Sequence, residues 1–292
     1  MTRNFLFMLI SVSGCFPVEM DKGGDTGLCA DSGGCETGNP DDTSSPDDTS
    51  SPDDCAEGTI SDAFSMPYMV DTDDLTTHAE DVPVTITGGL ATLVTATTFQ
   101  AGDLYFGERL PLGESFSTSF SFVISNPGGI TDPAGKSGGD GIALILHNED
   151  DAVGGDGGGL GYSGIDSVAV EFDTWLDVGL DDPTTQHVGI MVGGDNTHGS
   201  TENPDPGTDL STVGDIEGDV PVYAWVDYDG VTMSVYVSLE DSKPATPLVT
   251  RAVDVQAEIG GSLGYIGFSA ATGEAYEDIA LMSWTFEGTG CL

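Results

Sequence analysis

The segment that most constrains this chain is the alternating stretch Val168–Trp175. Successive side chains of a β-strand point to opposite faces, so Phe172 and the two valines fall on one face. Glu171, Asp173 and Trp175 fall on the other face, with the two carboxylates about 6.8 Å apart along the strand. A single strand therefore carries an apolar face suited to a core and a polar face suited to a ligand.

Asp177, Asp182 and His187 follow this strand and complete a candidate set of metal ligands. Hard carboxylate oxygens suit Ca²⁺, whereas an imidazole among carboxylates suits Mn²⁺ or a similar transition ion. Carboxylate clusters arise easily in a chain with 50 Asp and Glu among 292 residues, so the histidine, one of four, is the discriminating residue. The alternative is a solvated acidic face beside a hydrogen-bonded histidine, on which Trp175 would be unusual.

Short alternating apolar runs, separated by Gly and Asp, fill the chain beyond residue 56. No window predicts an amphipathic helix of ten or more residues. Many short strands with glycine-rich turns favour an all-β sandwich. The expected strands are 116–122, 142–146, 168–175, 188–192, 220–227, 232–238, 265–270 and 279–286.

Several segments resemble the legume (L-type) lectins and their bacterial relatives. The family's metal-binding segment is similar to Glu171-Phe-Asp-Thr-Trp-Leu-Asp177, followed by Asp182-Pro183 and His187-Val-Gly-Ile190. The segments 116–122, 139–143, 157–162, 267–273 and 281–286 follow in the family's order. The resemblance covers about residues 56–292 and implies a concanavalin A-like jelly-roll sandwich of two large antiparallel sheets.

The resemblance also implies two bound ions, which would lock the binding loops and reduce the entropy lost on binding. It assigns Mn²⁺ or another transition metal to Glu171, Asp173, Asp182 and His187. It assigns Ca²⁺ to Asp173, the backbone carbonyl of Trp175, Asp177 and Asp182.

A carbohydrate site assembled from separate loops follows from the same resemblance. Asp140, in a Gly-Asp-Gly turn, is similar to the family's sugar-binding Asp, which a cis peptide bond usually precedes. A glycine run would let the sugar approach the backbone, an aromatic ring would pack on the sugar's apolar side, and a C-terminal loop would tune specificity. The implied sugar-binding residues are Asp140, Gly158, Gly159, Trp175, Asp177, Glu274 and Ala275.

These assignments have structural alternatives, and one position departs from the family. Asp140 could be only a turn residue, the run 157–159 could be flexible low complexity, and Trp175 could belong to the core. The family usually has Asn where this chain has Asp177. A carboxylate only accepts hydrogen bonds, whereas Asn also donates, so Asp177 should keep an ion but alter one sugar contact. A preference for mannose or galactose therefore does not carry over.

Residues 1–14 are typical of a secretion signal. Arg3 supplies the positive start, and the apolar run Phe5–Val12 is too short to span a membrane, which needs about 20 residues. Val12-Ser-Gly-Cys15 has the form of a bacterial lipobox, which predicts that Cys15 carries lipid; an ordinary signal peptide is the alternative. The expected location is the bacterial outer membrane, at the cell surface or the periplasmic face.

Residues 15–55 consist mainly of Gly, Asp, Ser, Thr and Pro, a composition that predicts a disordered acidic tether before a domain at 56–292. Four further cysteines in an exported chain favour disulfides. Because the first and last strands of the implied fold are neighbours, Cys55 would pair with Cys291, and Cys29 would pair with Cys35. All three connectivities stay open.

The formal net charge is -44, and only four Lys or Arg residues lie beyond residue 56. Such a surface repels polyanions, so neither nucleic acids nor anionic glycans are expected partners. The membrane would be contacted only through the lipid. Glucanases with a related sandwich need a second Glu where this chain has Trp175 or Leu176. A hydrolase-like motif at 260–264 and a dinucleotide-like motif at 159–164 both lead into expected strands, where a helix is required.

The sequence therefore predicts a calcium-dependent carbohydrate-binding domain that is exported, tethered by lipid and not an enzyme. Neutral glycans or glycoconjugates are the expected partners. The alternative is a structural or adhesive surface domain that keeps its metals for rigidity and binds protein.

Overall fold

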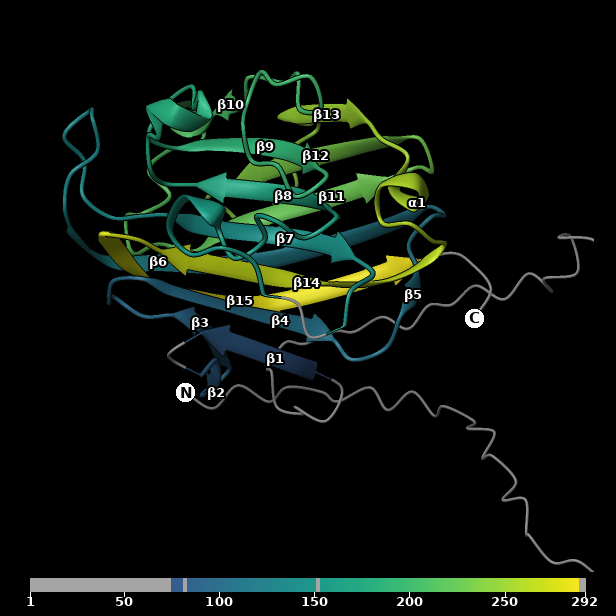
Figure 1. The fold of residues 1–292 in the computed structure, drawn as a ribbon, viewed down its shortest axis with the longest axis horizontal. Coiled ribbons are helices and arrows are strands. Elements are labelled where there is room, and N and C mark those ends of the chain that lie inside the picture. Colours follow the sequence, from purple (N-terminus) through teal and green to yellow (C-terminus); the bar gives the residue numbers. More distant parts are fainter. Residues whose placement is uncertain (1–74, 81–82, 151–152, 289–292) are drawn as a thin grey trace, which may run out of the picture. The chain divides into compact units, whose positions relative to one another are not determined.

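The computed structural model describes residues 75–80, 83–150 and 153–288, whose strands form two antiparallel sheets (Figure 1). One core of apolar side chains from both sheets lies between them. The predicted all-β sandwich is confirmed, and every expected strand coincides with an observed one. The helical elements of the described ranges are short: α1 (Val255–Glu258), and the 3-10 helices η1 (Gly157–Gly159), η2 (Val178–Leu180) and η3 (Leu210–Thr212).

The eight-stranded sheet carries three of the predicted metal ligands, Glu171 and Asp173 on one strand and His187 on the neighbouring strand. Its strands are β1 (Leu75–Glu80), β4 (Gln100–Phe106), β5 (Leu110–Pro111), β7 (Gly141–His147), β8 (Ser167–Asp173), β9 (His187–Val192), β10 (Thr208–Asp209) and β14 (Leu263–Thr272). They follow the order β1-β4-β14-β7-β8-β9-β10, with β5 paired to β14. Because β8 ends at Asp173, Trp175 lies beyond the strand that the sequence predicted to include it.

The seven-stranded sheet packs against the first and shows the expected alternation. Its strands are β2 (Thr85–Thr87), β3 (Leu90–Val94), β6 (Phe116–Gly129), β11 (Val222–Tyr228), β12 (Thr232–Ser238), β13 (Val249–Ala252) and β15 (Ala275–Gly288). Buried and partly exposed residues alternate strictly along β11 and β12. One face of this sheet therefore meets the core and the other meets solvent.

Aromatic rings from both sheets meet at the centre of the core. Phe122 packs edge-on against Phe172 at 5.3 Å between centroids, and Phe120 packs against Phe268 at 4.8 Å. Trp284 closes the group against Phe268 at 5.1 Å. Edge-to-face pairs of this kind add about 0.5–1.5 kcal/mol each beyond the burial of area.

The eight-stranded sheet is also covered on its outward face, which the alternating pattern of β8 did not predict. The segment 154–165, which precedes β8, packs a second apolar cluster onto that face, including Leu160, Tyr162 and Ile165. Ser269 Oγ of β14 donates to the Leu160 carbonyl at 2.9 Å and fixes this segment. Polar groups on the outward face are consequently buried rather than solvated.

The N-terminal predictions lie outside the described residues. They comprise the signal segment 1–14, lipidation at Cys15, the tether 15–55, the start of the domain at 56, and the pairings of Cys29, Cys35, Cys55 and Cys291. Within the ranges that the structure covers, no helix combines the length and apolarity needed to cross a bilayer.

Candidate functional site

Strands β8 and β9 place acidic and imidazole side chains on the same face of the sheet. In their antiparallel register Asp173 lies opposite His187, and Glu171 lies opposite Gly189. Opposed residues of an antiparallel pair project from the same face. A Cβ atom at Gly189 would lie 2.8 Å from Glu171 Oε1, so the glycine leaves room for this carboxylate.

Five side chains converge at the edge of the sheet where β8 ends and β9 begins, and we call them the acid–histidine cluster. Ligand atoms of Glu171, His187 and His198 lie within 4.8 Å of one another, as do those of Asp173, Asp182 and His187. His187 Nε2 is 3.8 Å from Asp182 Oδ1 and 4.0 Å from Glu171 Oε1. The structure thus brings together all four residues that the resemblance assigned to a transition metal.

His198 is the member of the cluster that the sequence did not predict. Its Nε2 lies 2.9 Å from His187 Nε2 and 2.8 Å from Glu171 Oε1, and the residue is 1% exposed. It stands on the loop after β9, where its N–H donates to the Leu180 carbonyl at 2.9 Å. The one available signal was its rarity, since the chain has only four histidines.

Burial disfavours the charged forms of Asp173, Asp182 and His187, whereas at His198 the hydrogen bond and charge of Glu171 outweigh burial and raise the pKa. Burial raises the pKa of Asp182 to about 7 and lowers the pKa of His187 to about 4. It also raises the pKa of Asp173 well above its usual range, and the neighbouring Asp182 and Glu171 carboxylates raise it further. Like-charged groups buried so closely must either take up protons or bind a cation, because either one offsets the lost hydration.

The donor set fits a divalent ion. Glu171 Oε1 is buried and has no hydrogen-bond partner among the described residues, while Tyr162 Oη donates to the other oxygen at 2.5 Å. Carboxylate oxygens and imidazole nitrogens are the ligands that transition ions take in proteins. Glu171, Asp173, Asp182, His187 and His198 would hold such an ion.

The loop after β8 orients the carboxylates that the resemblance assigned to Ca²⁺. Trp175 N–H donates to Asp173 Oδ1 at 2.7 Å, and Asp177 N–H donates to Asp182 Oδ2 at 2.6 Å. Asp177 itself caps η2 by accepting from Gly179 N–H at 2.7 Å. Each clamped carboxylate retains lone pairs for an ion, and Asp177 lies beside the acid–histidine cluster rather than within it.

Asp140 lies in the loop before β7, behind a cis Gly139–Asp140 peptide bond. Its N–H donates to the Ala271 carbonyl at 3.0 Å, and its carbonyl accepts from Thr174 N–H at 2.9 Å. The residue is 5% exposed, and its Oδ2 has no hydrogen-bond partner within the described ranges. Burial raises the pKa of this carboxyl to about 7, against the effect of a hydrogen bond that it accepts from the Gly273 backbone. The arrangement presents a carboxylate oxygen that only accepts.

Helix η1 brings the predicted glycines beside these acids. A Cβ atom at Gly158 would lie 3.6 Å from Asp177 Oδ2, and Asn196 Nδ2 donates to the Gly158 carbonyl. A Cβ atom at Gly159 would instead meet Ser163 of the same segment at 3.3 Å. Gly158 therefore faces the acids, whereas Gly159 faces its own turn.

The remaining predicted sugar-binding residues differ in how far they are exposed to solvent. Trp175 is partly exposed, and a Cβ atom at Gly139 would lie 3.3 Å from its Cε3 atom. Glu274 is exposed between β14 and β15. Ala275 begins β15 and is 2% exposed, so its side chain lies behind the surface that Glu274 reaches.

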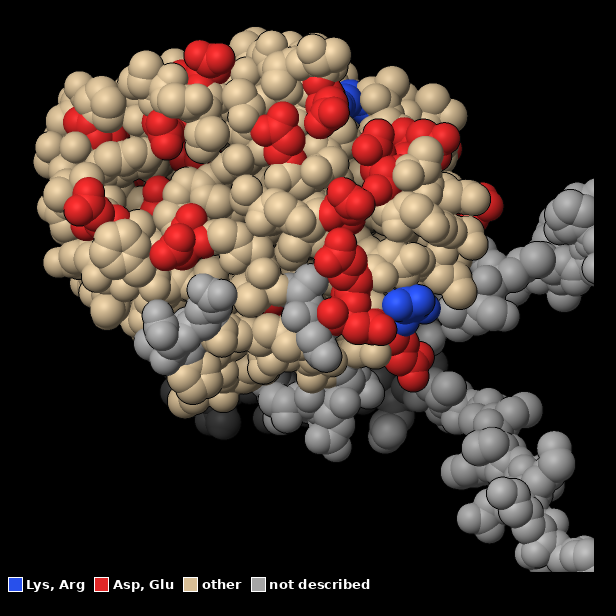
Figure 2. Space-filling model, viewed as in Figure 1, with Lys and Arg blue, Asp and Glu red and all other residues tan. Residues whose placement is uncertain are grey.

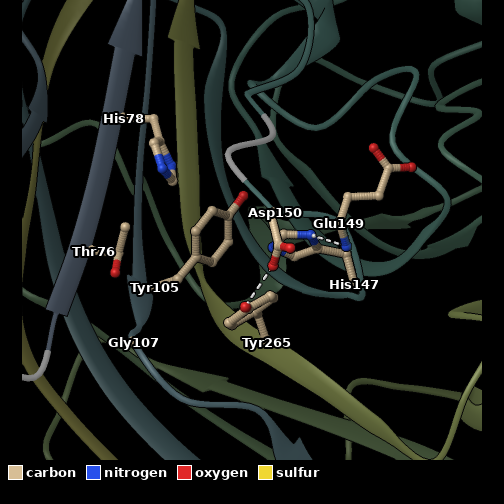
Figure 3. A pocket seen from close by; sticks show the side chains of 8 residues that line it. All are labelled: Thr76, His78, Tyr105, Gly107, His147, Glu149, Asp150 and Tyr265. Carbon is tan, nitrogen blue, oxygen red and sulfur yellow. Dashed lines mark hydrogen bonds between the residues drawn. The ribbon is translucent and has the colours of Figure 1, made fainter.

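A second polar group lies elsewhere on the same sheet, in a pocket of about 330 Å³ that we call the tyrosine pocket (Figure 3). Tyr265 Oη donates to Asp150 Oδ1 at 2.6 Å, and Glu149 N–H donates to His147 Nδ1 at 3.3 Å. The Tyr105 and His147 rings lie 4.4 Å apart. The pocket is lined by Thr76, His78, Tyr105, Gly107, His147, Glu149, Asp150 and Tyr265.

The two enzyme-like motifs lead into strands, as predicted from the sequence. The motif at 260–264 runs into β14, and the motif at 159–164 is followed by β8. A nucleophile elbow and a dinucleotide-binding turn both require a helix at that point, so neither motif has its structural context.

Comparison with known proteins gives a consistent family match. The model of the legume lectin domain matches residues 64–291. An L-type lectin-domain containing receptor kinase, VIII.1 of Arabidopsis thaliana, is 32% identical over 183 residues, covering 60% of this chain and 24% of the kinase. The kinase SIT2 of Oryza sativa subsp. japonica is 35% identical over 130 residues, covering 42% of this chain and 19% of the kinase. The chain thus spans about a quarter of these relatives or less.

A solved structure supports the same fold. The lectin from Bauhinia forficata, in complex with GalNAc, superposes with a TM-score of 0.63 and 26% sequence identity. The match covers 78% of this chain and 98% of the Bauhinia lectin.

Proposed function

The chain belongs to the legume lectin domain family, which binds carbohydrates, and on that premise we propose that its loop site binds a neutral glycan with the help of Ca²⁺ and a transition ion. Asp140 is the observation that carries the proposal. Its Oδ2 is a buried acceptor without a partner among the described residues, and a pair of sugar hydroxyls would satisfy it. Without such a ligand, a buried unpaired acceptor costs about 1–3 kcal/mol.

The ions would act on the loops rather than on the sugar. Divalent cations, when bound, neutralise the clustered carboxylates of Asp173 and Asp182. Those carboxylates are clamped by backbone N–H groups of the loop that also carries Trp175 and Asp177. Thr174 N–H of the same loop binds the Asp140 carbonyl. Metal binding and the position of Asp140 are therefore linked through one short segment.

A neutral sugar suits this surface better than an anionic one. Figure 2 shows acidic side chains spread over the visible face with few basic ones between them. Such a surface repels anions. The similar lectin from Bauhinia forficata forms a complex with GalNAc, a neutral sugar. Asp177 would accept from the ligand without donating, which favours a hydroxyl as its partner.

We extend the proposal to the N-terminal segment on sequence grounds alone. Cys15 would carry lipid, residues 15–55 would form the tether, and residues 56–292 would be displayed from a bacterial outer membrane. Metabolic labelling with a fatty-acid analogue would mark the wild-type chain but not Cys15→Ser. Labelling of both chains, or of neither, would contradict lipidation at this residue.

The decisive experiment is a glycan array probed with the full chain, with Ca²⁺ and a transition ion present and then with a chelator. We expect selective binding that the chelator abolishes and that Asp140→Asn reduces at least 100-fold. Asp241→Asn, an exposed acid, is the matched control and should bind as the wild type does. Absence of binding by the folded, metal-loaded chain would sink the proposal and favour a metal-rigidified domain that binds protein.

A further inference from the structure

Resting on the proposed function for its metal requirement, we infer that the transition-metal site of this chain is a two-imidazole site. In it His198 is a direct protein ligand beside His187 and Glu171. The site would then take a nitrogen-preferring ion, with Zn²⁺ as the prime candidate, in preference to the oxygen-preferring Mn²⁺. The ligand set assigned from the sequence contained a single histidine, so this changes both the donor count and the expected ion.

The three proposed ligand atoms already surround a point. His198 Nε2 lies 2.9 Å from His187 Nε2 and 2.8 Å from Glu171 Oε1. Around Zn²⁺, with bonds of about 2.0–2.1 Å, tetrahedral ligand atoms lie roughly 3.3 Å apart. The observed separations therefore need to open by only about 0.5 Å to admit the ion. Asp182 Oδ1, at 3.8 and 3.9 Å from the two nitrogens, is placed to supply a fourth ligand.

The ring orientations leave ligand lone pairs pointing at this centre. His187 Nδ1 lies 3.1 Å from the Thr184 carbonyl, and His198 Nδ1 lies 3.4 Å from the Asp205 carbonyl. A carbonyl can only accept, so each neutral ring carries its proton on Nδ1. Both Nε2 atoms are then acceptors. This outer hydrogen bond from the far ring nitrogen is the usual support of a metal-bound histidine.

With both rings neutral, as they must be when they bind a metal, three acceptors face one another without a donor. Two Nε2 lone pairs and the Glu171 Oε1 atom lie within 2.8–4.0 Å of each other. No hydrogen-bond partner of Glu171 Oε1 occurs in the part of the chain that the structure describes. Lone pairs at these separations repel in a buried site unless a cation lies among them.

The surrounding backbone makes space for the second imidazole. A Cβ atom at Gly207 would lie 3.0 Å from His198 Cε1 and 3.2 Å from His187 Cδ2, and Gly207 has a φ of +78°. A Cβ atom at Gly189 would lie 2.9 Å from His198 Cε1. Glycine at both positions is what lets the His198 ring enter. The loop that carries it is fixed by Asn203 Nδ2, which donates to the Asp195 carbonyl at 2.6 Å.

The test measures metal selectivity, because Zn²⁺ binds most sites more tightly than Mn²⁺ whatever their ligands. The full chain, stripped by a chelator and resupplied with saturating Ca²⁺, is titrated with Zn²⁺ and Mn²⁺ by calorimetry. In His198→Ser we expect the ratio of Zn²⁺ to Mn²⁺ affinities to fall at least tenfold. His78→Gln, a histidine outside the acid–histidine cluster, is the matched control and should keep the wild-type ratio. An unchanged ratio in His198→Ser would overturn the inference.

A second measurement needs no variant, in case His198→Ser does not fold. X-ray absorption at the zinc edge of the wild-type chain counts imidazoles through their multiple scattering. Two imidazoles per zinc are expected, and one would overturn the inference. Neither readout involves sugar, so failure of glycan binding with a confirmed two-imidazole site would reject the proposed function alone.

Discussion

The acid–histidine cluster and the tyrosine pocket lie on the same outward face of one sheet, yet their acids have different kinds of partner. In and beside the tyrosine pocket the acids have protein donors: His78 N–H donates to Asp103 Oδ1 at 2.9 Å, and Tyr265 donates to Asp150. In the acid–histidine cluster, Glu171 Oε1 instead faces imidazole nitrogens, without a hydrogen-bond partner among the described residues. In the first arrangement each of these acids has at least one oxygen held by a protein donor, although Asp103 Oδ2 and Tyr105 Oη are buried without a hydrogen-bond partner among the described residues. In the second, the unpartnered oxygen lies among imidazole nitrogens, a set that suits a cation.

This difference separates a structural polar network from a ligand site better than the number of acids does. The chain is acidic throughout, so a group of carboxylates by itself carries little information. Convergence of acceptors with few donors, in a buried position, is costly for the free protein. Such an arrangement is expected where the binding free energy of an ion offsets that cost.

Removing the ions gives the largest effect that we predict, and it tests the comparison directly. An ion present at a thousand times its dissociation constant stabilises the folded chain by about 4.1 kcal/mol. For a domain of this size that corresponds to a loss of roughly 8–16 °C in melting temperature when a chelator is added. Differential scanning calorimetry with and without chelator measures it.

Asp103→Asn provides the control for this experiment, because Asp103 lies outside the acid–histidine cluster. The variant should lose as much melting temperature on chelation as the wild type. A wild-type melting temperature that does not respond to chelation would show that the cluster is complete without metal, and the two regions would then be equivalent.

Asp173→Asn should have opposite effects in the two metal states. Without metal, the amide removes one of several buried like charges, and we expect the free energy of unfolding to rise by roughly 1–3 kcal/mol, less than the 4 kcal/mol of two charges 4 Å apart at a dielectric of 20. With metal, the variant loses a ligand and should fall below the wild type. Chemical denaturation in both states measures the two signs, and the same sign in both would contradict a cation site.

The two regions also differ in how far the sequence predicted them. The alternation of β8 fixes which face meets the core, because a strand's side-chain period is two. It therefore placed Glu171 and Asp173 on one face correctly. His187 joins them on the same face because it begins β9, the strand paired with β8. These residues are predictable because regular structure positions them.

Loop-borne and tertiary features were not predictable in that way. His198 reaches the cluster through a loop whose path depends on glycine contacts and side-chain bonds distant in the sequence. The tyrosine pocket depends on β1 and β4, strands that the alternating pattern did not reveal, and β4 carries Gly102 and Asp103 at positions unusual for a strand. The burial of the outward face could not be predicted from the alternating pattern, because it depends on the segment 154–165 folding over that face.

Asp103 should make the free energy of unfolding depend on pH. Burial raises its pKa from 3.8 to about 7 against the opposing effect of His78, and the Tyr105 ring packs near His78. A raised carboxyl pKa contributes stability below pH 3.8 that is lost as the pH rises to about 7. Asp103→Asn stays uncharged and keeps an acceptor for His78. We expect it to lie close to the wild type in stability near pH 4 and to become progressively more stable than the wild type as the pH rises towards 7.

Urea denaturation of the metal-loaded chains at several pH values measures this difference. Asp241→Asn, at an exposed position, should show no such dependence. A constant offset between Asp103→Asn and the wild type across this range would mean that Asp103 is ionised throughout, balanced by its donors.

Tyr265→Phe should have the smallest effect, and it tests whether the tyrosine pocket is only structural. It removes the hydroxyl that donates to Asp150, whose side chain is 69% exposed and is also paired with Arg109. Exposed polar pairs of this kind contribute about 0–1 kcal/mol. We expect a loss of stability below about 0.5 kcal/mol and unchanged glycan and metal binding, measured by calorimetry. A change in glycan binding would place the tyrosine pocket in the ligand site, and having protein donors would then no longer distinguish structural acids from functional ones.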